Sequence, residues 1–119
     1  MSNSYLSTLI CRQAKKYGDR IALKYRDYET ESWISVSWNQ FAEKVNWVSN
    51  ALIALGAEVQ ENIGVFSQNM PECLYTDFGA FGSRIVTIPL YATSSEAQVH
   101  YILQDAGIRF LFVGETIPV

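Results

Sequence analysis

Residues 63–88, with the sequence IGVFSQNMPECLYTDFGAFGSRIVTI, decide the fold of this chain. The stretch begins and ends with short, largely apolar runs, and a segment long enough for a helix separates them. A third run, FLFV at residues 110–113, follows after a second segment of helical length. Such runs are typical of strands that are buried on both faces of a parallel sheet. The pattern therefore predicts an α/β fold with a β-α-β-α-β unit, a mainly parallel sheet and flanking helices, and it leaves the strand order open.

Start and stop signals predict the two helices that connect these strands. Asn69 with Glu72, and Thr93 with Glu96, have the spacing of a helix cap and its partner, and Pro71 is a further start signal for the first of these helices. The second helix is expected to end at Gly107. Its apolar face comprises Val99, Ile102, Leu103 and Ala106. Gly79 and Gly82 lie three residues apart in the first helix, and we expect them to allow that helix to approach the sheet closely.

The N-terminal half predicts a helix, a β-hairpin and a longer helix. The first helix should start at Ser4 and end at Gly18, and alternating apolar residues at 21–25 and 33–36 indicate the hairpin. Ser37 and Gln40 have capping-box spacing at the start of the long helix, and Gly56 supplies its end. The apolar stripe of that helix is Phe41, Val45, Val48, Leu52 and Leu55.

Composition bounds the class of protein. The 119 residues are 49% hydrophobic, which is enough for one globular unit over residues 1–119, divided into residues 1–60 and a βαβαβ subdomain over residues 61–119. Nine basic against twelve acidic side chains give a net charge of −3, which disfavours a nucleic-acid partner. No apolar run is long enough to cross a membrane and no signal peptide is evident, so we expect a cytoplasmic protein without a transmembrane segment.

A self-sufficient catalytic or metal site is not evident in the sequence. No glycine-rich phosphate loop is present, and the polar turn at residues 67–72 is interpreted as a cap and turn, with anion binding as the alternative. Cys73 and His100 are the one conceivable nucleophile and base, but they fall on different helices. We therefore predict no catalytic residue and no metal ligand.

The other polar and aromatic side chains are given structural roles. Both cysteines, Cys11 and Cys73, are expected to be buried thiols. The acidic side chains expected to face water are Asp77, Glu96 and Asp105. The tryptophans expected in the core or covering the hairpin are Trp33, Trp38 and Trp47.

Five segments in order resemble the N-terminal segment of AMP-forming acyl-CoA synthetases, most closely the long-chain fatty-acid CoA ligases. They are the WISVSW stretch at residues 33–38, the helix that follows it, IGVFSQNMPE at 63–72, IPLYAT at 88–93, and YIL at 101–103. The resemblance implies a parent enzyme that activates a fatty acid with ATP and Mg²⁺ to acyl-AMP and then transfers it to CoA. It also implies that His100 and Tyr101 face CoA, although the arginine by which some relatives contact the CoA phosphate is absent from this helix.

The motifs that perform the family's chemistry have no counterpart in these residues: the Ser/Thr/Gly-rich loop ending in lysine, the Tyr-Gly-x-Thr-Glu segment, the ribose-binding aspartate and the C-terminal lysine. We therefore expect an N-terminal fragment, cut near residues 114–116, that is inactive, binds no cofactor itself and has the rest of its own full-length chain as partner. An incomplete sheet should leave apolar surface or a strand edge exposed, so the isolated chain should self-associate, as a symmetric dimer.

Two other interpretations are considered. A stand-alone, non-catalytic interaction module could have the same partial fold, but the apolar residues 117–119 directly after the last strand favour a fragment. A small nucleotide-binding domain of flavodoxin type fits the strand and helix order but lacks the phosphate loop that it needs after Phe66.

Overall fold

The α/β fold expected from the sequence is confirmed by the computed structural model, which describes residues 6–114. Its elements are α1 (Leu6–Tyr17), β1 (Ile21–Asp27), β2 (Ser32–Ser37), α2 (Trp38–Ala54), β3 (Asn62–Phe66), α3 (Pro71–Gly82), β4 (Val86–Leu90), α4 (Glu96–Asp105) and β5 (Leu111–Val113). The expected helix start at Ser4 and the apolar residues 117–119 lie outside the described residues. Within residues 6–114, no helix is both long and apolar enough to span a membrane.

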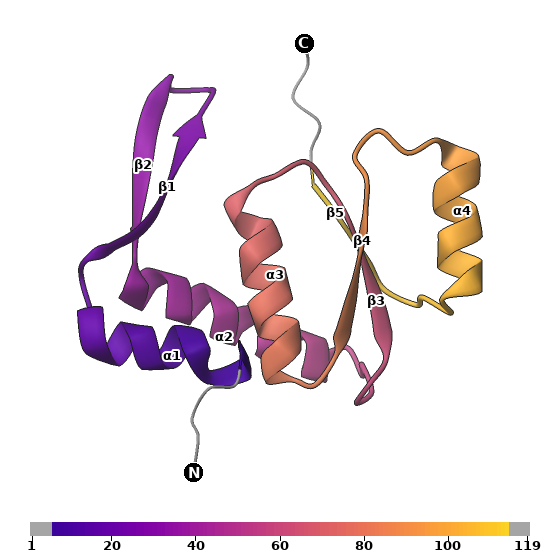
Figure 1. Ribbon diagram of the computed structural model, residues 1–119, viewed down its shortest axis with the longest axis horizontal. Coiled ribbons are helices and arrows are strands. Elements are labelled where there is room, and N and C mark those ends of the chain that lie inside the picture. Colours follow the sequence, from indigo (N-terminus) through magenta and orange to yellow (C-terminus); the bar gives the residue numbers. More distant parts are fainter. Residues whose placement is uncertain (1–5, 115–119) are drawn as a thin grey trace.

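The two sheets are separate (Figure 1). Strands β1 and β2 form an antiparallel hairpin, with an irregularity in the register between Ile21 and Leu23. The other sheet is parallel and has the order β4-β3-β5, which the sequence left open. The most buried strand, β3, is central, because a central strand must bury both of its faces.

The two faces of the parallel sheet are covered unequally. Ile63 is completely buried on the side of α2 and α3, in a cluster with Leu52, Ala80 and Ile85. Gly64 points to the opposite side, where a Cβ would meet the side chains of Leu90, Ile108 and Leu111. Helix α4 lies on that second side (Figure 1) and has no fully buried residue. The face of the sheet toward α2 and α3 therefore forms part of a buried core, whereas the face toward α4 is less completely buried.

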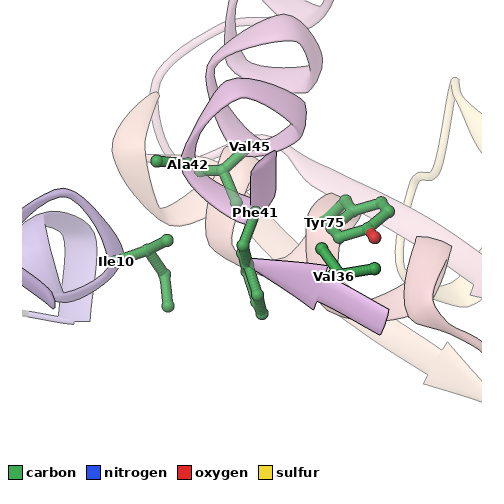
Figure 2. Packing of buried hydrophobic residues seen from close by; sticks show 6 residues of the cluster. All are labelled: Ile10, Val36, Phe41, Ala42, Val45 and Tyr75. Carbon is green, nitrogen blue, oxygen red and sulfur yellow. The ribbon is translucent and has the colours of Figure 1, made fainter. Parts of the chain in front are cut away.

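A second buried cluster joins the N-terminal half to α3 (Figure 2). Its members are Ile10, Val36, Phe41, Ala42, Val45 and Tyr75. The ring of Phe41 packs edge-on against the ring of Tyr75, with 5.5 Å between their centroids. Because these residues come from α1, β2, α2 and α3, the hairpin and the parallel sheet are attached to one helical layer.

Gly79 and Gly82 allow close packing, but not against the sheet as predicted. A Cβ on Gly79 would lie 2.7 Å from the Cβ of Val48, on α2. A Cβ on Gly82 would also face α2, at 3.5 Å from the Oγ of Ser49. The prediction about the partner was wrong because α3 is packed between the sheet and α2, and its glycines face the second helix.

The predicted caps are correct for one helix and wrong for two. Ser37 and Gln40 form the expected capping box of α2. Helix α3 has Met70 as its N-cap residue, without a side-chain hydrogen bond, so Asn69 does not cap it. Helix α4 begins two residues later than predicted, because Ser95 and Gln98 form its capping box in place of Thr93 and Glu96.

Several side chains are more exposed than predicted. Cys11 is exposed and Cys73 is half-buried, so the expectation of two buried thiols was wrong. Trp33, Trp47 and Leu55 are all more than half exposed. Leu55 leaves the apolar stripe because α2 has already ended at Ala54.

Asp77 does not face water freely. Its side chain is half-buried on α3, and burial raises its pKa, an effect partly opposed by a hydrogen bond with Thr87. The helical spacing placed it on the polar side, but β4 comes close enough to α3 to cover that side.

Candidate functional site

A shallow hollow of about 700 Å³ lies between the end of β4 and the first turns of α4. Its lining comprises Tyr91, Thr93, Ser94, Ala97, Gln98, Tyr101 and Ile102. Tyr91 and Tyr101 are 85% and 67% exposed, so both rings offer apolar surface to solvent. A hollow with two exposed aromatic rings is suited to stack against a planar group.

The local sequence builds this hollow through a turn. Ser94 N–H donates to the carbonyl of Tyr91, which brings the chain round before α4 starts. Ser95 Oγ then accepts from the N–H of Gln98, and Gln98 Oε1 accepts from the N–H of Ser95. Two backbone N–H groups at the start of α4 therefore already donate hydrogen bonds to side chains of the same segment.

The charge around the hollow is negative. Residues 85–108 contain no Lys or Arg, and Glu96 lies in the first turn of α4. Both the capping box and this charge make the start of α4 a poor site for an anion.

Of the candidate residues Tyr101, His100 and Cys73, one lies at the hollow. Tyr101 lines it, whereas His100, which is exposed on the same helix, is not among the lining residues. Cys73 donates its Sγ–H to the carbonyl of Gln68 at 3.3 Å. Because α3 and α4 cover opposite faces of the sheet (Figure 1), Cys73 and His100 are not brought together. Tyr91 was recognised in the sequence as part of a motif, but its partnership with Tyr101 depends on the turn.

A larger hollow of about 880 Å³ separates the hairpin from the start of α3. Both basic and acidic side chains line it, including Lys24, Arg26 and Asp77. Arg26 lies over the ring of Trp33, with its Cζ 5.9 Å from the ring centroid. The charged side chains around it are of both signs, with Lys24 and Arg26 against the acidic Asp27, Glu29, Glu72 and Asp77.

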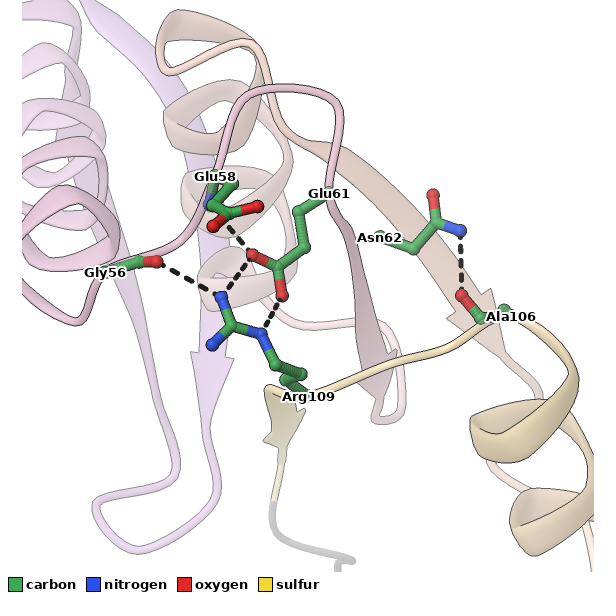
Figure 3. Close-up of polar contacts among 6 residues, drawn as sticks. All are labelled: Gly56, Glu58, Glu61, Asn62, Ala106 and Arg109. Carbon is green, nitrogen blue, oxygen red and sulfur yellow. Dashed lines mark hydrogen bonds and ion pairs between the residues drawn. The ribbon is translucent and has the colours of Figure 1, made fainter.

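An ion pair connects the ends of three segments (Figure 3). Arg109 Nε and Nη2 donate to the two carboxylate oxygens of Glu61 at 2.6 and 2.7 Å, and Nη2 also donates to the carbonyl of Gly56. The Arg109 hydrogen bonds, together with a bond from the N–H of Glu58, lower the pKa of Glu61 from 4.5 to about 2. The pair fixes the segment before β5 against the end of α2, and nothing in the sequence pattern indicated it.

The polar side chains offer no evident metal site. Among residues 6–114, no group of three or more His, Cys, Asp or Glu is arranged to hold a metal ion.

A family model described as AMP-binding enzyme matches residues 10–118. The chain belongs to the AMP-binding enzyme family. Among curated relatives of this chain, the long-chain-fatty-acid–CoA ligase FadD15 of Mycobacterium bovis is 32% identical over 80 residues, 67% of this chain and 13% of that protein. Long chain acyl-CoA synthetase 1 of Arabidopsis thaliana is 26% identical over 111 residues, 91% of this chain and 17% of that protein. These relatives confirm the resemblance to acyl-CoA synthetases.

Solved structures share the fold of this chain. The N-terminal domain of FACL13 from Mycobacterium tuberculosis has a TM-score of 0.80 and 20% sequence identity, and the match covers 92% of this chain and 27% of that one. The N-terminal subdomain of Klebsiella oxytoca NpsA also has a TM-score of 0.80, with 16% identity and coverage of 97% and 29%. The chain thus spans about a quarter of these structures and less than a fifth of the curated relatives' length.

Proposed function

We propose that this chain is the first part of the adenylation domain of a long-chain fatty-acid CoA ligase. In that enzyme a fatty acid would react with ATP to give acyl-AMP and pyrophosphate, and CoA would then displace AMP. The family match over residues 10–118 carries the proposal, and the ligase names of several relatives support the substrate class. The cytoplasmic location expected from the sequence remains a prediction.

The chain's own role in this enzyme would be structural, with one face toward a substrate. ATP and Mg²⁺ are assigned to the motifs that these 119 residues lack. Without the lysine-terminated loop, nothing in the chain supplies the positive charge that adenylyl transfer requires at the α-phosphate. We expect no pyrophosphate release above a protein-free control when the chain is mixed with ATP, Mg²⁺, CoA and a long-chain acid. Turnover above that control would contradict this division of roles.

Tyr101 is the residue through which we expect the chain to contact CoA. Its exposed ring and that of Tyr91 line the same hollow and offer stacking surfaces for an adenine. The CoA phosphates should extend away from the hollow, because no Lys or Arg occurs in residues 85–108. His100 is retained as a weaker candidate on the neighbouring position of α4.

A binding experiment with two matched variants tests this site. CoA is titrated into the chain and amide chemical shifts are followed by NMR. Tyr101→Ala should weaken binding about tenfold, since loss of one stacked aromatic ring costs about 1–3 kcal/mol, while His100→Ala should have a smaller effect. An equal loss of CoA affinity in both variants would indicate that CoA contacts the chain outside the hollow. Absence of any shift in residues 91–102 at millimolar CoA would reject the site.

A further inference from the structure

The end of α4 is closed by a motif that leaves one carbonyl to be paired outside the helix. Gly107 N–H donates to the carbonyl of Gln104, and Ile108 N–H donates to the carbonyl of Leu103 at 2.9 Å. With Gly107 at a positive φ of 63°, these two bonds form a Schellman motif. The carbonyl of the C-cap residue, Ala106, has no partner within the helix in such a motif.

The partner of this carbonyl is Asn62, the first residue of β3. Its Nδ2 donates to the carbonyl of Ala106 at 2.9 Å, across 44 positions of the chain (Figure 3). The next residue, Ile63, is completely buried, so the strand that carries the donor is itself fixed in the core. The bond therefore connects the C-cap of α4 to the most buried strand of the sheet.

The residues that follow α4 are held in the same place. The side chain of Ile108 lies over Gly64, with its Cδ1 3.5 Å from the position that a Cβ on Gly64 would take. Arg109 pairs with Glu61, the residue directly before Asn62. Three contacts in succession thus locate the end of α4 against the start of β3.

The two aromatic rings of the hollow belong to different elements. Tyr91 follows β4 directly, whereas Tyr101 lies on α4. Tyr101 is six positions beyond Ser95, where the turn from β4 meets the helix, which corresponds to about 9 Å along the helix axis. A tilt of α4 by about 10° about that turn would move Tyr101 by about 1.5 Å. The separation of the rings therefore depends on where the far end of α4 is held.

We propose that Asn62 is a positioning residue, whose bond to Ala106 sets the tilt of α4 and thereby the separation of the Tyr91 and Tyr101 rings. The ligand in this inference, CoA, rests on the proposed function, whereas the placement of the helix concerns the chain alone. Asn62 does not line the hollow, so it acts through α4 and not by touching the ligand. Two rings can contact one planar group together only at a suitable spacing.

Residual dipolar couplings of the backbone amides test the placement of α4 without any ligand. In the parent chain, the couplings of α4 and β3 should fit one common alignment frame. Asn62→Leu, which is similar in size but has no donor, should move the α4 couplings out of that frame. Asn62→Asp, which keeps the shape and also lacks the N–H, should act in the same direction.

Ser83→Ala is the matched control. It removes another side-chain hydrogen bond to a backbone carbonyl, from Ser83 Oγ to Ser49, which joins α3 to α2 on the other face of the sheet. This variant loses a comparable bond, but the couplings of α4 should still fit the frame of β3. Circular dichroism establishes that every variant is folded.

A CoA titration then tests whether the placement matters for binding. Asn62→Leu should weaken CoA binding about three- to tenfold, the effect expected for one hydrogen bond, while Ser83→Ala should leave the affinity unchanged. In a Tyr101→Ala background, Asn62→Leu should have little further effect, because the ring that it positions is gone. A merely structural role of Asn62 would not produce this dependence on Tyr101.

Three results would each overturn the proposal. They are α4 couplings that do not change in either Asn62 variant, losses of CoA affinity that add in the double variant, and an equal loss of affinity in Ser83→Ala. If the parent chain shows no shift with CoA, the proposed CoA contact fails, and the dipolar couplings still decide whether Asn62 positions the helix.

Discussion

Replacing Gly79 by alanine tests the close contact between α2 and α3. The added Cβ would lie 2.7 Å from both Cβ and Cγ1 of Val48 and 3.0 Å from the carbonyl oxygen of Val45. Carbon atoms in favourable contact are about 3.5–4.0 Å apart, so the helices must separate or Val48 must change its position. The carbonyl oxygen of Val45 belongs to the backbone and cannot rotate aside as a side chain can, so a change in the position of Val48 alone does not relieve every short contact.

The expected magnitude is a balance of two opposing effects. Overpacking a well-packed contact costs about 1–3 kcal/mol. Replacing glycine by alanine within a helix contributes about 1 kcal/mol in the other direction. We therefore expect Gly79→Ala to lower the free energy of unfolding by about 1 kcal/mol, a fall in Tm of about 3–5 °C for a chain of this size.

Gly82→Ala is the matched control on the same helix. Its Cβ would lie 3.5 Å from the Oγ of Ser49, an ordinary contact, so only the gain in helix propensity applies. Because Gly82 is the last residue of α3, we expect this variant to be more stable than the parent by about 0.5 kcal/mol.

Urea unfolding followed by tryptophan fluorescence measures the stability of both variants. Adding Val48→Ala to Gly79→Ala should cost less than the sum of the two single losses, because it removes Cγ1, one of the two Val48 atoms in conflict. If Gly79→Ala stabilises the chain as much as Gly82→Ala does, the reasoning about the helix contact is refuted.

Two further predictions concern acid stability and the core. The pKa of Glu61 is lowered to about 2 in the folded chain, so the stabilisation from its pair with Arg109 is present above about pH 4.5 and is lost as the pH falls toward 2. The urea midpoint should therefore fall less between pH 6 and pH 3 in Glu61→Gln than in the parent, and equal slopes would contradict the role of the pair. Leu52→Ala should lower the free energy of unfolding by about 2–5 kcal/mol, because Leu52 is completely buried. Leu55→Ala on the same helix should change it by less than about 0.5 kcal/mol, because Leu55 is mostly exposed, and similar losses in both would argue against the described burial.

Local patterns predicted the elements well. Ser37 and Gln40 form the capping box that their spacing indicates, and Gly56 adopts a positive φ of 85° at the end of α2. The three apolar runs are the three parallel strands. These features depend on residues within a few positions of one another, so the sequence displays them directly.

Predictions that required knowledge of a distant neighbour were less successful. Cys11 and Trp47 are apolar enough to be core residues, yet both are exposed in the described part of the chain. Asp77 was assigned to solvent from its helical position, but it approaches Thr87 of another element. At the candidate site, Tyr101 was identified through resemblance, and its association with Tyr91 required the turn before α4.

The sequence by itself determined the order and type of the elements and the family, because periodicity, caps and motifs depend on residues that are close together along the chain. Tertiary structure decided which strand is central, which helix Gly79 approaches, and that Arg109 meets Glu61 across 48 positions. It also decided that β4 and β5 are the outer strands of the parallel sheet that the described residues form. The physical reason is that these outcomes depend on which surfaces pack together, and many pairings are compatible with the same local pattern.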